Sequence, residues 1–218
     1  DIQVQDQKQV PHAILSRVMA YSDKGSSLNL TSKANNGKLD WQVPSGKWDI
    51  VVLYIGKTLQ KVKRAAPGGE GYVMDHLNKQ AVGRYFAHFE KVFKDNHANY
   101  PHTFFNDSYE VYGADWTPDL LEQFAKRRGY RLEDYFMEFL SKERNDTTAR
   151  IISDYRETIS ELLLENFTHP WSTFAHKHGS ITRNQAHGSP ANLIDIYAAV
   201  DIPECEGFGL SQFHIKGL

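Results

Sequence analysis

Acidic side chains gather next to aromatic ones in the stretch FFNDSYEVYGADWT, which covers residues 104–117. Asp107 and Glu110 follow two phenylalanines that favour a strand, and Tyr109 and Trp116 lie close by in the sequence. A carboxyl group that loses hydration beside aromatic rings has a raised pKa and can act as a general acid at neutral pH. Glu110 is therefore the first candidate catalytic residue, although a helix-capping or ion-paired surface glutamate would show the same spacing.

A second acidic group follows the apolar stretch VDIP, where Glu204 and Glu206 are separated by one residue. In an extended segment these two side chains point the same way. Either could act as a base opposite Glu110 or hold a cation. The chain between Glu110 and Glu204 holds two or three βα units at about 30 residues each, so the two positions can face each other across a barrel mouth. A solvated acidic loop is the alternative interpretation.

Asp107 and Asp201 each follow apolar residues at a predicted strand end, where carboxylates can bind Ca²⁺ or orient a sugar hydroxyl. Glu204 joins Asp107 as a candidate metal ligand, and His187, in the polar loop NQAHGSP, is a candidate for hydroxyl binding. The spacing does not match an EF-hand loop, so the metal signal is unspecific. A metal-dependent hydrolase built from Asp107, Glu204 and His187 is a weaker alternative.

From residue 75 onward, predicted helices alternate with short predicted strands. The strands HTFFND, SITRNQ and VDIPE each lead into polar residues. Such alternation predicts parallel βα units, and ligands bind at the carboxyl ends of parallel strands. The predicted helices are NKQAVGRYFAHFEKVFKDN with Asp75 or Asn78 as cap, TPDLLEQFAKRRG, RLEDYFMEFLSK, a long helix capped by Asp146 and interrupted near Pro170, and PANLIDIYAA.

Residues 11–60 show the pattern of β structure. Asn36-Gly37 and the stretch from Pro44 to Gly46 are turn signals, and the segments KLDWQV and WDIVVLYI are rich in β-branched and aromatic residues. We predict an antiparallel hairpin from these two segments. The predicted division is a β-rich region over residues 1–62 and a barrel-like catalytic portion over residues 63–218.

Composition narrows the function classes. The 218 residues carry a net charge of −2, which gives no strong field for nucleic acid or an anionic membrane. A single cysteine, Cys205, precludes an internal disulfide, and no apolar run approaches the roughly 18 residues of a membrane span. The polar first residues are not a signal peptide. The glycine-rich stretch KRAAPGGEGYVMDH lacks a phosphate-loop pattern, and Ser108 lacks the elbow of serine hydrolases.

Four stretches together resemble glycoside hydrolase family 106, the α-L-rhamnosidases. They are VPSGKWDIVVLY, VKRAAPGGEGYVMDHLNKQAVGRYF, FFNDSYEVYGADWTPDLLEQFAKRRGYRLEDY and NQAHGSPANLIDIYAAVDIPECEGFG. The resemblance implies a catalytic (β/α)₈ barrel that hydrolyses terminal α-L-rhamnosides with inversion, with calcium in the sugar site. It also implies a periplasmic or extracellular protein whose partner is a rhamnose-containing carbohydrate.

The resemblance also assigns roles to individual residues. Glu110 matches the position of the general acid, and Glu204 and Glu206 match the acidic strand end that supplies the base or contacts calcium. His187 matches a sugar-facing loop residue. In the mechanism that we hypothesise, Tyr109 and Trp116 would pack on the apolar face of the sugar, and the hydroxyl contacts would come from Asp107, His187 and Asp201.

Members of the family are several times longer than this chain. We therefore predict an α/β fold that is a partial (β/α)₈ TIM barrel with an N-terminal antiparallel β region. The expected partners are the remainder of a larger polypeptide or further copies of the chain. Two alternatives stay open: a non-catalytic carbohydrate-binding or structural piece, and a retaining β-glycosidase. Retaining enzymes hold their two carboxyl groups about 5–5.5 Å apart, against about 6.5–9.5 Å for inverting enzymes.

Overall fold

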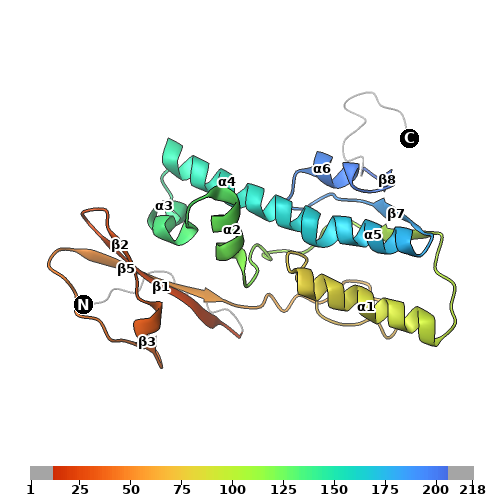
Figure 1. Cartoon of the computed structure of the whole chain (residues 1–218), viewed down its shortest axis with the longest axis horizontal. Coiled ribbons are helices and arrows are strands. Elements are labelled where there is room, and N and C mark those ends of the chain that lie inside the picture. Colours follow the sequence, from red (N-terminus) through yellow and green to blue (C-terminus); the bar gives the residue numbers. More distant parts are fainter. Residues whose placement is uncertain (1–11, 206–218) are drawn as a thin grey trace. The chain divides into compact units, whose positions relative to one another are not determined.

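The computed structural model describes residues 12–205 (Figure 1). The chain forms two compact units: unit 1 comprises residues 1–73 and 116–158, and unit 2 comprises residues 74–115 and 159–218. Each unit therefore consists of two segments that are separated in the sequence. This division groups residues 116–158 with residues 1–73. The functional boundary predicted at residue 62 stays a prediction.

Unit 1 contains an antiparallel sheet of three strands in the order β2-β1-β5. Its strands are β1 (Ile14–Ser22), β2 (Ser27–Asn29) and β5 (Trp48–Ile55). The predicted strand over WDIVVLYI is confirmed as β5, but the predicted hairpin partner was wrong. β5 pairs with β1 along its whole length, because β1 offers the buried run Val18–Tyr21, whereas residues 40–47 form no strand.

A smaller hairpin uses the predicted turn at Asn36-Gly37. Strands β3 (Ala34–Asn35) and β4 (Lys38–Leu39) pair across it. Both turn residues have positive φ angles, 47° and 73°, which suit asparagine and glycine in a tight hairpin turn. A short 3-10 helix (Thr31–Lys33) precedes this hairpin.

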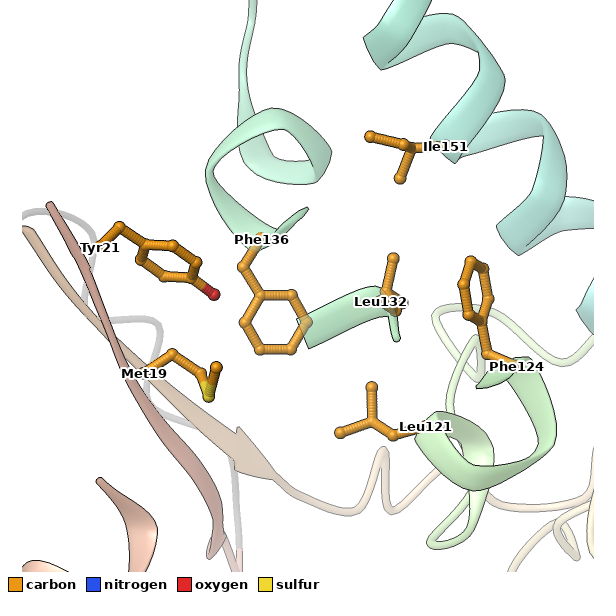
Figure 2. Packing of buried hydrophobic residues seen from close by; sticks show 7 residues of the cluster. All are labelled: Met19, Tyr21, Leu121, Phe124, Leu132, Phe136 and Ile151. Atoms are coloured by element: carbon orange, nitrogen blue, oxygen red, sulfur yellow. The ribbon is translucent and has the colours of Figure 1, made fainter. Parts of the chain in front are cut away.

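The helices of unit 1 bury their apolar faces against β1. They are α2 (Leu120–Arg128), a 3-10 turn (Leu132–Tyr135), α3 (Phe136–Leu140) and the portion of α4 (Asp146–Leu163) up to residue 158. Figure 2 shows Met19 and Tyr21 of β1 facing Phe136. The cluster consists of Met19, Tyr21, Leu121, Phe124, Leu132, Phe136 and Ile151. Gly129 ends α2 with a φ of 78°, as the sequence predicts for a left-handed cap.

Unit 2 contains the parallel sheet. Strands β6 (Thr103–Asn106), β7 (Ile181–Asn184) and β8 (Ile202–Pro203) run parallel in the order β6-β7-β8. The predicted parallel arrangement is confirmed for these strands. The described residues form a mixed fold of helices and sheets without a closed barrel, so the described part of the chain does not establish a TIM barrel.

Helices alternate with the strands of this sheet along the chain. Helix α1 (Lys79–Asp95) begins where predicted, because the Asn78 side chain accepts a hydrogen bond from the Ala81 N–H at 2.9 Å. Helix α4 continues through a π-helical turn (Leu164–Thr168) into α5 (His169–Lys177), with Pro170 in the first turn of α5. The predicted interruption is thus a change of helix type. Helix α6 (Leu193–Ala198) follows β7.

The two faces of the parallel sheet have different environments. Phe104 of β6 packs toward Phe174 of α5 at 5.8 Å between ring centroids, and Phe174 stacks on Phe86 of α1 at 5.0 Å. On the other face, Phe105 is 52% exposed and its register partner Arg183 is also exposed. Helices therefore cover one face, and side chains of the other face are open. Within residues 12–205, no helix is both long and apolar enough to span a bilayer.

Candidate active site

Polar side chains meet at the carboxyl edge of the parallel sheet in unit 2. Asn106 at the end of β6 donates a side-chain hydrogen bond to Asn184 at the end of β7, with 2.8 Å between Nδ2 and Oδ1. The backbone continues the register past the strands: Gln185 N–H donates to Asn106, and Glu204 N–H donates to Asn184, both at 2.9 Å. The three strand ends are therefore level, as the sequence predicts.

The loops after β6 and β7 are joined directly. The Tyr109 N–H donates to the His187 carbonyl at 2.7 Å. Gly188 has a φ of 80°, and a Cβ atom at this position would lie only 2.7 Å from the Tyr109 carbonyl oxygen. Asp107 accepts a hydrogen bond from the Ser108 N–H at 2.8 Å, which fixes the turn before Tyr109. The loops that carry the predicted residues Asp107, Glu110 and His187 thus run side by side.

The contact at Gly188 predicts a specific mutational effect. A Gly188→Ala substitution should lower the free energy of unfolding by more than the roughly 1–2 kcal/mol that a left-handed backbone costs, because the Tyr109 carbonyl must also move. Gly113→Ala is the matched control, since Gly113 has a φ of 67° but open space around its Cβ position. Urea denaturation of both variants tests this, and equal losses would contradict the close contact.

Glu204 lies one residue beyond β8, on the open face of the sheet. Its carboxylate forms an ion pair with Arg183, and the Arg183 guanidinium lies 5.2 Å from the centroid of the Phe105 ring. The Tyr197 hydroxyl donates to the Glu204 carbonyl at 3.0 Å. These contacts hold Glu204 next to the Arg183 guanidinium, on the open face of the sheet.

Glu110 and Glu204 follow the two outer strands of this sheet. β6 and β8 lie on either side of β7. At the usual spacing between strands their ends are about 10 Å apart. Glu110 is exposed in the loop after β6, and Glu204 is partly buried directly after β8. The structure therefore brings these two predicted carboxylates to one edge of one sheet.

Asp201 differs from its predicted placement at a strand end. It lies immediately before β8 rather than after it. Its carboxylate accepts hydrogen bonds from the Thr182 N–H at 2.8 Å and the Thr182 hydroxyl at 2.9 Å, and it contacts His176 Nε2 at 2.9 Å. The hydrogen bond from the Thr182 backbone, with help from His176, lowers the pKa of Asp201. These contacts connect β7, α5 and the start of β8.

An Asp201→Ala substitution should therefore act on stability. It leaves the buried Thr182 N–H and hydroxyl without this acceptor, which should cost about 1–3 kcal/mol. Asp195→Ala, which removes an exposed carboxylate from α6, should cost less. Chemical denaturation at pH 7 measures both. An equal loss in the two variants would show that the contacts to Thr182 contribute little.

The two aromatic candidates lie in different units. Tyr109, in unit 2, places its ring 5.3 Å from the His76 ring, and burial raises the pKa of Tyr109. Trp116 belongs to unit 1, where it packs against the hydrophobic cluster and lies 6.4 Å from Tyr155. Core packing accounts for Trp116 in this structure. Its predicted contact with sugar stays a prediction.

Two further predictions concern Glu206 and calcium. Glu206 lies outside the described residues. Within residues 12–205, no group of three or more His, Cys, Asp or Glu side chains is arranged to hold a metal ion. The calcium site predicted at Asp107 and Glu204 therefore stays a prediction.

His76 is a chemically distinctive residue near this edge that the sequence analysis did not select. Its ring contacts the rings of Tyr109 and Phe167 at 5.3 and 4.7 Å between centroids. Burial lowers the pKa of His76 to about 4, although the backbone of Met74 acts in the opposite direction. The available sequence signal was its position just before Asn78, the cap of α1.

Comparison with known proteins identifies the family of the chain. The model of a family described as alpha-L-rhamnosidase matches residues 5–208. The chain belongs to glycoside hydrolase family 106. The resemblance stated from the sequence motifs is thus confirmed, and family 106 membership covers unit 1 as well as unit 2.

Two similar proteins extend this assignment. A curated relative from Formosa agariphila, named "Putative beta-glucuronidase", is 30% identical over 194 residues, which are 86% of this chain and 17% of the relative. The solved structure of a rhamnosidase from Novosphingobium sp. PP1Y matches with a TM-score of 0.71 and 24% identity, over 83% of this chain and 19% of that one. The family 106 chain therefore shares its fold with part of a rhamnosidase and spans less than a fifth of either protein.

Proposed function

We propose that this chain contributes the acid and base carboxylates of an inverting glycoside hydrolase that cleaves terminal α-L-rhamnosides. Family membership supports the reaction class. The observation that carries the assignment of residues is the meeting of the Glu110 and His187 loops with Glu204 at one carboxyl edge. In parallel α/β folds this edge is where substrates bind.

The proposed reaction is a single displacement at the anomeric carbon. Glu110 gives its proton to the glycosidic oxygen as the bond from that oxygen to the anomeric carbon breaks. A water molecule on the opposite face attacks the carbon and loses a proton to Glu204 or Glu206. Inverting enzymes need about 6.5–9.5 Å between the carboxyl groups to admit this water. The distance from the Glu110 carboxyl group to that of Glu204 or Glu206 therefore decides between an inverting and a retaining mechanism.

Substrate contacts in this proposal come from the loops next to the two carboxylates. Tyr109 offers an aromatic surface, and Asp107 and His187 are exposed polar groups able to bind sugar hydroxyls. Asp201 contributes indirectly, since its described contacts bind Thr182 and His176. Measuring the KM of an Asp107→Asn variant separates a binding role from a purely structural one, because a binding role raises KM without loss of stability.

We propose that calcium binds at this edge through one of the two predicted ligands. Asp107 is an exposed carboxylate and can supply the oxygen ligand that Ca²⁺ prefers. Glu204 is already paired with the Arg183 guanidinium, which opposes a second cation at the same oxygen atoms. We therefore propose Asp107 rather than Glu204 as the calcium ligand within the described residues. Calorimetric titration of Ca²⁺ into wild-type and Asp107→Asn protein tests this, and unchanged binding would contradict it.

The decisive experiment measures the stereochemistry of hydrolysis in the intact polypeptide. Phenyl α-L-rhamnoside is hydrolysed in an NMR tube, and the anomeric proton of the first rhamnose formed is assigned. Inversion gives the β-anomer first. An α-anomer would contradict the proposed single displacement, and no release of rhamnose would contradict the substrate class.

A β-glucuronide is the informative comparison substrate, because the relative from Formosa agariphila carries that name. A uronate sugar adds a carboxylate, which needs a cationic partner. Arg183 at this edge is neutralised by Glu204, so we expect the α-L-rhamnoside to be preferred. Preference for phenyl β-glucuronide would transfer the proposal to that substrate class.

One observation favours a second function for the isolated chain. The chain spans 17% of the length of the curated relative and 19% of the length of the solved rhamnosidase chain. The proposal for this case is a carbohydrate-binding portion that pairs with further sequence or with a second copy before it turns over substrate. Light scattering and rhamnoside binding on the isolated chain test it. We also propose a periplasmic or extracellular location, which fractionation of cells would check.

A further inference from the structure

The backbone immediately before the proposed acid is held by the neighbouring loop of unit 2. The Tyr109 N–H donates to the His187 carbonyl at 2.7 Å, and a Cβ atom at position 188 would lie only 2.7 Å from the Tyr109 carbonyl oxygen. Tyr109 is bonded directly to Glu110 in the chain. The position of the Tyr109 backbone therefore limits where the Glu110 carboxyl group can lie.

The side chain of Tyr109 is held as well, by a series of ring contacts. Its ring lies 5.3 Å from that of His76, and the His76 ring lies 4.7 Å from that of Phe167, both measured between centroids. Phe167 in turn stacks on Trp171 of α5 at 6.1 Å. Phe167 and Trp171 are only 7% and 6% exposed, so this end of the series is buried within unit 2. His76 thus connects Tyr109 to buried rings.

Phe167 reaches His76 from the π-helical turn between α4 and α5, which covers Leu164–Thr168. The Asn166 side chain of this turn donates to the carbonyl of Leu77, the residue after His76, at 2.8 Å. The turn therefore contacts the segment around His76 both through a ring and through a hydrogen bond. π-Helical turns are rare and occur frequently at functional sites, which agrees with a role in holding the acid loop.

His76 acts in this arrangement through packing rather than charge. Burial lowers the pKa of His76 to about 4, so its ring is neutral at pH 7. Phenylalanine can replace a neutral ring between two aromatic rings with little change in volume, whereas alanine leaves a gap beside Tyr109. The two substitutions therefore separate the loss of packing from the loss of the imidazole.

We propose that His76 and Phe167 are positioning residues for the general acid: they hold Tyr109, and Tyr109 sets the place of Glu110 relative to the glycosidic oxygen. This inference rests on the proposed function for the role of Glu110. Neither His76 nor Phe167 needs to touch the sugar. Misplacing a reacting group by about 1 Å can cost about 10²-fold in rate, so the loss of one ring behind Tyr109 should be visible in turnover.

Turnover of two rhamnosides by the intact polypeptide tests the inference. His76→Ala and Phe167→Ala should each lower kcat for phenyl α-L-rhamnoside by about 10–100-fold, with KM changed by less than about threefold. For 2,4-dinitrophenyl α-L-rhamnoside, whose leaving group needs little protonation, kcat should fall by less than about threefold. His76→Phe should restore most of the loss on the phenyl compound.

Two further measurements distinguish positioning from general destabilisation. Phe93→Ala is the matched control, because Phe93 stacks on Tyr100 at 4.4 Å within unit 2 and none of its described ring contacts involves His76 or Phe167. It should lower stability without any dependence of kcat on the leaving group. Hydrogen exchange of the Tyr109 amide does not require hydrolysis, and His76→Ala should speed it by at least about tenfold, whereas Phe93→Ala should not.

The outcomes separate this inference from the proposed function. Equal losses of His76→Ala on the two rhamnosides, or unchanged exchange of the Tyr109 amide, would overturn the inference while Glu110→Gln still shows the dependence expected of an acid. Failure of His76→Phe to recover turnover would also overturn it. Equal losses of Glu110→Gln on both rhamnosides would instead remove the acid role, and the positioning role with it.

The fold of each variant is checked by circular dichroism. Should the alanine variants unfold, Phe167→Leu gives the same comparison, because leucine keeps most of the buried volume but removes the flat ring that contacts His76. Its loss of kcat should again be larger on the phenyl compound than on the dinitrophenyl compound, and equal losses would overturn the inference.

Discussion

Glu110→Gln should lower the turnover number for phenyl α-L-rhamnoside by about 10²–10⁴-fold, the usual contribution of a positioned general acid. Glutamine keeps the size and the hydrogen-bonding atoms of the side chain but cannot give a proton to the leaving oxygen. Because Glu110 is exposed in the loop after β6, the substitution should leave the free energy of unfolding within about 0.5 kcal/mol of wild type.

The leaving group gives this prediction its sharpest control. A 2,4-dinitrophenyl α-L-rhamnoside needs little protonation, so Glu110→Gln should lose far less activity on it than on the phenyl compound. Glu204→Gln removes the proposed base, and its loss should be similar for both substrates. Equal losses of Glu110→Gln on the two substrates would exclude the acid role, and the role would then have to be sought at another carboxylate.

Lowering the pH from 7 toward 4 should reduce the free energy of unfolding by up to about 3 kcal/mol through His76 alone. The folded-state pKa of His76 is about 4, against an ordinary value of 6.5. As the pH falls below 6.5, the unfolded chain takes up a proton that the folded chain does not. The stability present above pH 6.5 is therefore lost progressively down to about pH 4, below which His76 adds no further loss.

Urea denaturation at pH 7, 6, 5 and 4.5 measures this slope. His76→Phe should remove most of it, because phenylalanine fills the space between Tyr109 and Phe167 without titrating. His88→Phe, at an exposed position on α1, should retain it. Asp201 has a lowered pKa, so its contribution disappears only as the pH falls below its ordinary value of 3.8 and does not confuse this range. Identical slopes in all three proteins would show that the burial of His76 does not control this dependence.

Much of the secondary structure of unit 2 could be predicted from the sequence, because it depends on interactions within a few residues. The helix at α1 follows from apolar residues at helical spacing and from the Asn78 cap, both of which act within a few residues. The strands β6 and β7 follow from short apolar runs with polar ends. Once parallel strands are expected, their carboxyl ends must meet, so Glu110 and Glu204 could be assigned to one edge before their contacts were known.

Pairing between distant segments was less predictable. The strand β5 was identified correctly, but its partner is β1 rather than the segment just before it, because strand pairing depends on which surface can be buried together. Trp116 looked like part of the acidic stretch, yet it packs in unit 1 with Tyr155. Asp201 was predicted at a strand end, yet it lies immediately before β8, and its carboxylate binds Thr182.

The sequence by itself determined the family, the acidic positions and the elements that carry them, since motifs, caps and apolar spacing act over short distances along the chain. Only the tertiary structure decided the environment of each side chain. The pairing of Glu204 with Arg183, the close contact at Gly188 and the burial of His76 all depend on residues far away in the sequence. Desolvation and hydrogen bonding, which set the chemistry of a site, arise from those distant neighbours.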